Sequence, residues 1–310
     1  MTKVDNNKSN RREFLVAASA TTILANSQLK SLAESRKTAV PLPSIKLGDY
    51  SVSRLLAGWN PIGGYSYLGH NMDEHMKEYF TVENTTDYLL RCFEVGINTH
   101  QFDPTPLMIK VLEKVREKEP RMQFYGLHSG SSKWGTVTEV IKATSPFAMC
   151  HHGGVTDTLF RQGKQEQVHD YVKAVHDQGI LAGISAHNPD NIKRITDAGW
   201  ENDFFMTCFY YLTRFSDHPD DPDKDNHFGY PFSRSAPAAM TKVVREVDKP
   251  CIGFKILGGG RAGFTRNGVE EAFKFAFENI KKTDAVLVGM YPRFKDEMAE
   301  NAGWAAKYGG

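Results

Sequence analysis

Residues 180–199, ILAGISAHNPDNIKRITDAG, contain one complete strand-to-helix repeat. The run ILAGISAH (180–187) is almost continuously apolar, which is typical of a strand in a parallel sheet that is covered on both faces. Asn188 follows as an expected helix N-cap, and Pro189 occupies the first helical position, where no backbone N–H is needed. The stretch therefore predicts a β-strand followed directly by an α-helix over 188–199.

The same alternation recurs along the chain. Seven more strand-like runs lie at 51–58, 97–102, 123–128, 146–151, 203–211, 251–256 and 285–291. Helical patterns lie at 82–96, 107–120, 133–144, 164–179, 235–247 and 269–280. Eight such units in about 260 residues predict an α/β fold, a (β/α)8 TIM barrel, as one domain over residues 46–310. An open doubly wound sheet is the alternative, but no GxGxxG motif follows the first strand.

The first 35 residues have the pattern of an export signal. Arg11 and Arg12 precede Glu-Phe-Leu and the apolar run FLVAASATTILA, which is too short to span a membrane. The paired arginines predict a bacterial twin-arginine (Tat) signal peptide at 1–35, followed by a linker at 36–45; an amphipathic N-terminal helix is the alternative. We therefore expect the Tat machinery as an export partner, a periplasmic or extracellular location, and no membrane association after export.

The composition is that of an ordinary globular protein. Of 310 residues, 40% are hydrophobic and 24% charged, and the formal net charge is +1. This near-neutral balance gives no electrostatic reason to expect nucleic acid as a partner, so a small-molecule substrate is expected. The four cysteines lie far apart in apolar runs, which favours buried free thiols: Cys92, Cys150, Cys208 and Cys251.

Histidines end four consecutive expected strands, at the positions where barrel enzymes carry their sites. The residues are His100, His128, His151 and His187, and His152 begins the loop after the fourth strand. His152 is expected to have a structural role. Strand alternation predicts that the side chains of His128, His151 and His187 converge. Such a set fits a divalent Zn, Fe or Mn ion with an open coordination position, or proton transfer around an organic substrate.

Lys255 is expected at the end of the seventh strand, in GFKILGGGR. A lysine at this position either binds an anionic group or serves as a base or imine-forming amine. The adjacent Gly258–Gly260 run and Arg261 offer backbone N–H groups and a cation, which suit a phosphate or carboxylate. The acidic loop 217–227 is expected to be a solvated lid.

Five segments resemble the aldo-keto reductase superfamily and together cover most of residues 47–301. They are VSRLLAGWNPIGG, RCFEVGIN, GILAGISAHNPDNIKRITDAG, KPCIGFKILGGG and AVLVGMYPRFKDEMAEN. The resemblance implies the same barrel, and the reduction of carbonyl compounds by NADPH with a tyrosine as acid, assisted by lysine, aspartate and histidine.

The catalytic positions of that family match this sequence only in part. The family's histidine matches His151, and its lysine position holds His128. Its aspartate falls on Gln101, with Asp103 two residues later, and no tyrosine stands among residues 104–108. The resemblance therefore implies a divergent member in which these four residues, with Lys255, carry the chemistry.

The resemblance also implies NADP as cofactor. Ser185 matches the serine near the nicotinamide amide, and Tyr210 would stack on a ring. The remaining cofactor-binding candidates are Lys255, Gly289, Arg293 and Asn301.

Three functional hypotheses remain open. The first is an exported aldo-keto-reductase-like oxidoreductase acting on a polar carbonyl or sugar-like small molecule with non-standard catalytic residues. The second is a metal-dependent isomerase, lyase or hydrolase with His128, His151 and His187 as ligands. The third is a non-catalytic binding protein on the same barrel.

Overall fold

The computed structural model describes residues 41–227 and 229–310, so the expected signal peptide, and residues 36–40 of the expected linker, lie outside the described residues. Within these ranges eight parallel strands close into a barrel. They are β3 (Leu55–Ala57), β4 (Thr99–Phe102), β5 (Gln123–His128), β8 (Ala148–His151), β9 (Leu181–Ala186), β10 (Phe204–Cys208), β11 (Cys251–Phe254) and β12 (Ala285–Val288). Sequential strands are neighbours, and β12 pairs with β3 to complete the ring. The predicted (β/α)8 fold is confirmed.

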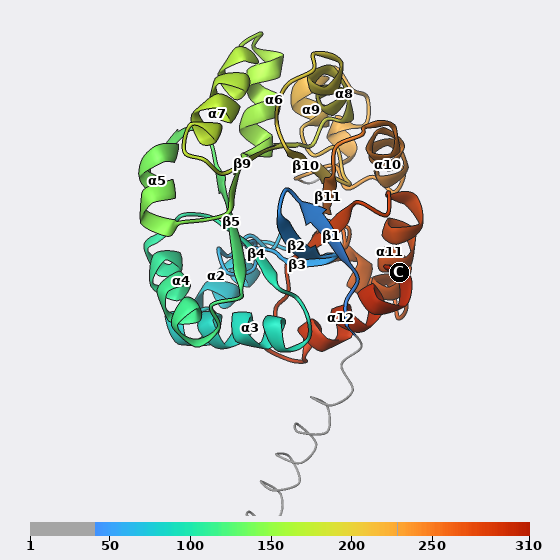
Figure 1. Ribbon diagram of the computed structural model, residues 1–310. Coiled ribbons are helices and arrows are strands. Elements are labelled where there is room, and N and C mark those ends of the chain that lie inside the picture. Colours follow the sequence, from blue (N-terminus) through green and yellow to red (C-terminus); the bar gives the residue numbers. More distant parts are fainter. Residues whose placement is uncertain (1–40, 228) are drawn as a thin grey trace, which may run out of the picture. The chain divides into compact units, whose positions relative to one another are not determined.

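Helices surround the strands on the outside of the barrel (Figure 1). Seven lie where the sequence pattern placed them: α3 (Val82–Glu94), α4 (Pro106–Lys118), α5 (Val137–Thr144), α7 (Glu166–His176), α8 (Pro189–Asp197), α10 (Ala236–Glu246) and α11 (Gly268–Asn279). Elements that were not expected include α2 (His70–Tyr79), α6 (Gly153–Arg161), α12 (Glu297–Tyr308) and the short β6 (Ser131–Ser132) and β7 (Gly135–Thr136). None of the helices in the described part of the chain is long and apolar enough to cross a membrane.

The run 51–58 forms two elements rather than one strand. Its first part is β2 (Tyr50–Ser53), which pairs antiparallel with β1 (Ser44–Leu47), a strand that begins inside the expected linker; its second part is β3. Arg54 separates them, because its buried guanidinium donates hydrogen bonds to the backbone carbonyl oxygens of Lys281, Asp284 and Gly309. These contacts satisfy a charge that would otherwise be buried without partners.

Each barrel strand is buried on both faces. One core lies inside the barrel, where Leu56, Tyr125 and Phe204 pack against Ile45 and Val52 of the β1–β2 hairpin. The hairpin therefore closes the end of the barrel where the strands begin (Figure 1). A second core lies between the strands and the helices. Ligands consequently have access from the other end, where the strands finish.

Candidate functional site

The inner face of the strands determines which side chains reach the open end of the barrel. Cys150 belongs to the interior core, and Met149 belongs to the core under the helices. Because side chains alternate along a strand, His151 must face the helices and His152 the barrel opening. The same rule places Ser185 and His187 above interior-facing Gly183, whose Cβ position meets the ring of Phe204.

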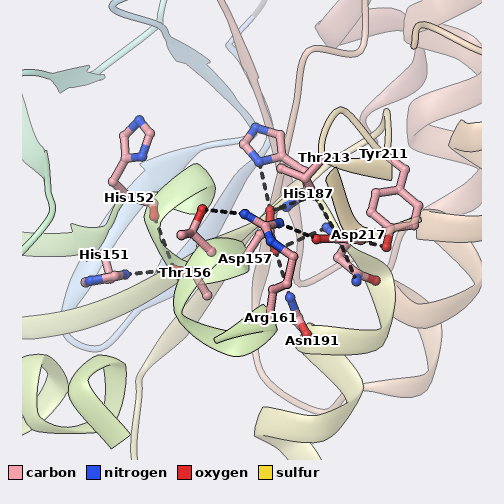
Figure 2. Close-up of polar contacts among 12 residues, drawn as sticks. His151, His152, Thr156, Asp157, Arg161, His187, Asn191, Tyr211, Thr213 and Asp217 are labelled. Atoms are coloured by element: carbon pink, nitrogen blue, oxygen red, sulfur yellow. Dashed lines mark hydrogen bonds and ion pairs between the residues drawn. The ribbon is translucent and has the colours of Figure 1, made fainter. Parts of the chain in front are cut away.

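The prediction that His151 lies in the pocket is wrong. Its Nδ1 is 2.7 Å from Oγ1 of Thr156 on α6, and its ring contacts Tyr171 on α7 edge to face. Burial lowers the pKa of His151 to about 3, so the ring is neutral at physiological pH. Figure 2 shows His151 and His152 pointing in different directions, with His151 directed at Thr156. His152, expected to be structural, faces the opening.

His128 is also held away from the opening. Its Nε2 is 3.1 Å from Oγ of Ser132, and its Nδ1 accepts a hydrogen bond from the backbone N–H of Gly130. The three-histidine metal site is therefore not formed, since only His187 of its three members faces the barrel opening. Among residues 41–227 and 229–310 no three His, Cys, Asp or Glu side chains are arranged to hold one metal ion.

His187 forms a buried pair with Asp157 of α6. Nδ1 of His187 lies 3.1 Å from Oδ2 of Asp157, which also accepts the backbone N–H of His187 at 2.9 Å. The other carboxylate oxygen accepts a hydrogen bond from the amide of Asn191 at 2.9 Å (Figure 2). Burial lowers the pKa of His187, and the hydrogen bond to Asp157 opposes that shift. A neutral ring that donates through Nδ1 leaves Nε2 unprotonated and able to accept a proton.

A second carboxylate extends this network towards the segment after β10. Asp217 accepts hydrogen bonds from the hydroxyl groups of Tyr211 and Thr213, and its Oδ1 lies 2.6 Å from the guanidinium of Arg161. The Thr213 hydroxyl lies between the two acids, 3.4 Å from Asp157. The network therefore ties α6 and His187 to residues 211–217, and these residues line the same side of the opening.

Asp103 follows β4 at the opening and is partly buried. Its Oδ1 lies 3.4 Å from the amide nitrogen of Gln101, whose side chain is buried. Burial raises the pKa of Asp103 to about 7, although Gln101 and the charge of Lys255 oppose the shift. A carboxyl group with such a pKa both gives and takes a proton near neutral pH.

Lys255 stands between these groups, directly after β11. Its Nζ lies 4.5 Å from the ring centroid of Phe254 and 5.2 Å from that of Tyr67. No carboxylate among the described residues lies within ion-pair distance of it. Its backbone has φ 59°, in the left-handed region that is rare for a non-glycine residue and common at functional sites. Lys255 is therefore a cation held in place without an acidic partner.

The residues expected to bind the cofactor lie at separate places in the structure. Ser185 is buried with a hydroxyl that has no hydrogen-bond partner among the described residues, and the half-buried Tyr210 ring lies against Gly258. At Gly289 a Cβ atom would lie 2.6 Å from the ring of Pro61, so the glycine allows this close packing. Arg293 is exposed, with its guanidinium 5.7 Å from the ring of Tyr79.

A cavity of about 470 Å³ lies close to the expected adenine-binding segment. Its wall includes Phe264, Arg266, Asn267, Lys295, Glu300 and Trp304. Asn301 is buried beside it and does not line it. The basic residues of this wall are Arg266 and Lys295, which the sequence pattern did not single out.

No protein-family model matches the sequence, and no curated protein matches it. Solved structures do match. One is an aldo-keto reductase from Bacillus halodurans in its holo form, with 11% identity and a TM-score of 0.54 over 85% of this chain and 90% of that one. Another is the glycerol dehydrogenase from Gluconobacter oxydans, with 11% identity and a TM-score of 0.52 over 86% and 95% of the two chains. The chain therefore shares its fold with aldo-keto reductases.

Asp157 is the residue of the site that sequence reasoning missed. It lies in the stretch HHGGVTD (151–157), in which the sequence pattern predicts a loop that begins at His152. The stretch is instead the start of α6, and its buried residues Thr156, Asp157 and Phe160 follow helical spacing. A buried acid on the apolar face of a short helix is the signal that would have identified it.

Proposed function

We propose that the opening of the barrel is an active site and that the protein is an oxidoreductase of polar carbonyl compounds that uses NADP. The observation that carries the proposal is Asp103, a carboxyl group with a pKa of about 7 at the end of a barrel strand, beside the unpaired Lys255. The shared fold with aldo-keto reductases supports the reaction class. Asp103 takes the place of the family's tyrosine as the acid that protonates the carbonyl oxygen.

Lys255 and Gln101 have supporting parts in this proposal. The Lys255 ammonium stabilises the negative charge that develops on the carbonyl oxygen during reduction. Gln101 holds Asp103 through its side-chain amide. The protein surroundings of His152, together with the charge of Lys255, lower its pKa to about 4, so the ring is neutral at physiological pH. It therefore acts as a hydrogen-bond partner of the substrate and adds no charge.

The residues present fit a nicotinamide dinucleotide. The free hydroxyl of Ser185 and the ring of Tyr210 would hold the nicotinamide, and the bound nucleotide would supply the hydride. The backbone N–H groups of Gly259 and Gly260 have no acceptor among the described residues, and both glycines have positive φ. Such a turn, next to Arg261, suits the diphosphate. Arg266 and Lys295, in the wall of the 470 Å³ cavity, would bind the phosphate of the adenosine end.

The direct test is a titration of the purified protein with NADPH, followed by quenching of intrinsic fluorescence, since Trp304 lines the cavity. We expect saturation in the micromolar range, and reduction of glyceraldehyde or dihydroxyacetone with loss of NADPH absorbance. Arg266→Ala should raise the Kd about tenfold, the loss of one charge-assisted hydrogen bond, while the exposed Lys274→Ala leaves it unchanged. Absence of NADPH binding at millimolar concentration contradicts the proposal.

We also propose that the protein is exported by the Tat machinery and acts in the periplasm or outside the cell. The support is the sequence Arg11-Arg12-Glu13-Phe14-Leu15 before the apolar run. A fusion of residues 1–45 to a reporter protein that is active only after export tests this. Export should require the Tat machinery and should stop when both arginines are changed to lysine. Export that continues in a cell without that machinery refutes the proposal.

A further inference from the structure

A cavity of about 340 Å³ opens beside His187, between the ends of β9 and β10 and helix α10. His187 and Cys208 form its inner wall, and Pro231, Ser233, Ser235 and Met240 belong to its outer wall. Its volume lies at the lower end of the range for small-molecule sites. It therefore suits a ligand much smaller than a dinucleotide.

The arginine that lines this cavity is already paired with carboxylates. The guanidinium of Arg214, which lines it, lies 2.6 Å from a carboxylate oxygen of Asp221 and 3.7 Å from one of Asp223. The hydroxyl groups of Ser233 and Ser235 offer hydrogen bonds, and proline, alanine and methionine side chains provide apolar contact. A cavity with these walls favours an uncharged molecule that carries hydroxyl groups.

The base at the inner wall is prepared for proton transfer. Asp157 fixes the orientation of the His187 ring through Nδ1, and its own side chain is completely buried. The same carboxylate oxygen accepts the backbone N–H of His187, which fixes the carboxylate beside the ring, so turning the ring breaks the Nδ1 hydrogen bond. Nε2 has no partner among the described residues and is the nitrogen left for a ligand in the cavity.

An unpaired cation lies close to this base. The His187 ring centroid is 5.6 Å from the ring centroid of Phe254, and Nζ of Lys255 is 4.5 Å from the same centroid. Both groups therefore contact the same aromatic ring, and the charge of Lys255 acts on the His187 imidazole. An ammonium group near the base could stabilise the negative charge that forms on the oxygen of a carbonyl compound held at Nε2.

We propose that His187 and Lys255 form a proton-transfer centre that enolises uncharged hydroxyketones, an isomerase-type activity that goes beyond the reductase proposed above. Nε2 of His187 takes the proton from the carbon next to the carbonyl group. The electron pair of that C–H bond forms the enediolate C=C bond, and the carbonyl π electrons move to the oxygen beside Lys255. Return of the proton to the same carbon restores or inverts it. Return to the neighbouring carbon yields the isomeric aldehyde: the enediol hydroxyl gives its proton to solvent as its oxygen becomes the carbonyl oxygen, and the former carbonyl oxygen takes a proton from solvent.

The electron balance requires no cofactor. Each proton removed returns from the imidazolium or from solvent, and the substrate is neither oxidised nor reduced overall. Lys255 supplies the electrophile that a metal ion would supply in the metal-dependent alternative. Asp157 is a positioning residue here, because it touches His187 and does not touch the substrate.

The test is the exchange of C–H hydrogen of dihydroxyacetone for deuterium in D₂O. The full chain catalyses it without added nucleotide. The loss of the CH₂ signal in ¹H NMR measures enolisation. We expect exchange that saturates with dihydroxyacetone concentration and that falls at least about 100-fold in His187→Gln, the usual contribution of a general base. His70→Gln, a surface substitution on α2, is the matched control and should exchange at the wild-type rate. Circular dichroism and thermal melting establish that the variants are folded.

Two results would overturn the inference. One is exchange by the wild type that is no faster than exchange in buffer, and the other is an unchanged rate in a folded His187→Gln protein. The outcome is separate from that of the proposed reductase, because exchange needs no NADPH. Exchange without NADPH-dependent reduction supports the proton-transfer centre and contradicts the reductase. Reduction without exchange does the reverse.

Discussion

Nδ1 of His187 lies 3.1 Å from Oδ2 of Asp157, and the two residues come from different elements, the end of β9 and the middle of α6. The pair is possible because α6 starts directly after β8 and approaches β9 closely. A Cβ atom on Gly153, the first residue of that helix, would lie 2.8 Å from Oγ of Ser185 and 3.1 Å from Cε1 of His187. The glycine is thus a requirement of packing, and the helix brings the carboxylate to the imidazole.

Replacing Asp157 with asparagine should reduce α-proton exchange about tenfold to a hundredfold, because the amide no longer fixes the His187 tautomer. Asp157 raises the pKa of His187 against the effect of burial, so the variant should have a lower His187 pKa. The acid limb of the pH–rate profile should then move to lower pH. Rates of exchange measured from pH 4 to pH 8 test both effects.

The control for this variant is Asp190→Asn, the same chemical change on an exposed carboxylate in the first turn of α8. Its pH–rate profile should match that of the wild type. If Asp157→Asn lowers the rate but leaves the profile in place, Asp157 supports the fold and does not position His187.

Asp103 should make the stability of the protein depend on pH. Burial raises the pKa of Asp103 from 3.8 to about 7. In the unfolded chain the carboxyl group is ionised above about pH 4, so between about pH 4 and pH 7 only the folded state holds the proton. Stability attributable to this group therefore falls as the pH rises through that window.

Asp103→Asn should accordingly be more stable than the wild type above pH 7, by up to about 4 kcal/mol, and equal to it below pH 4. Urea denaturation at several pH values measures the difference, and Asp87→Asn on the exposed face of α3 is the control. The variant should also lose most of its carbonyl reduction. A stability difference that does not change with pH would show that Asp103 is ionised in the folded protein.

His151 and His152 should have opposite effects when each is changed to alanine. His151→Ala removes a hydrogen bond with Thr156 and a contact with Tyr171, which should lower the free energy of unfolding by about 2 kcal/mol. His152→Ala should change the free energy of unfolding by less than about 0.5 kcal/mol, since the side chain is exposed. His152→Ala should reduce kcat/KM for carbonyl reduction about tenfold, whereas His151→Ala should keep the wild-type kcat/KM per folded molecule. The reverse pattern would restore the assignment made from the sequence.

The barrel was predictable because its signal is repeated: eight strands separated by helices leave few alternatives. The direction of the side chains was not predictable in the same way. Alternation tells which residues of a strand share a face, but both faces of these strands are buried and apolar, so the pattern does not show which face is inside. His151 and His152 were interchanged for this reason. His187 was predicted at the opening and lies there, whereas the catalytic roles of Asp103 and Lys255 stay predictions.

The partner of His187 and the second cavity depend on contacts between distant segments. Asp157 and His187 are 30 residues apart, and they meet only once α6 and β9 are in place. Arg266 and Lys295 line one cavity although they come from different loops, after β11 and after β12. No spacing rule within one element connects such residues, so their role became visible only in the folded chain.

The volume of the 340 Å³ cavity should limit the size of the substrate that binds beside His187. Helix α10 offers a matched pair of variants to test this. Ala239 lines the cavity, whereas the adjacent Ala238 is exposed and does not line it. Ala239→Trp should fill most of the cavity and raise the concentration of dihydroxyacetone needed for half-maximal exchange about tenfold or more, since a blocked site loses apolar contact and hydrogen bonds together. Ala238→Trp should leave this concentration unchanged. NADPH binding, measured by fluorescence, should be the same in both variants, because the adenosine end of the nucleotide would bind at the 470 Å³ cavity, which shares no lining residue with this one. If Ala239→Trp weakens NADPH and leaves exchange intact, the cavity belongs to the nucleotide and His187 faces a different substrate site.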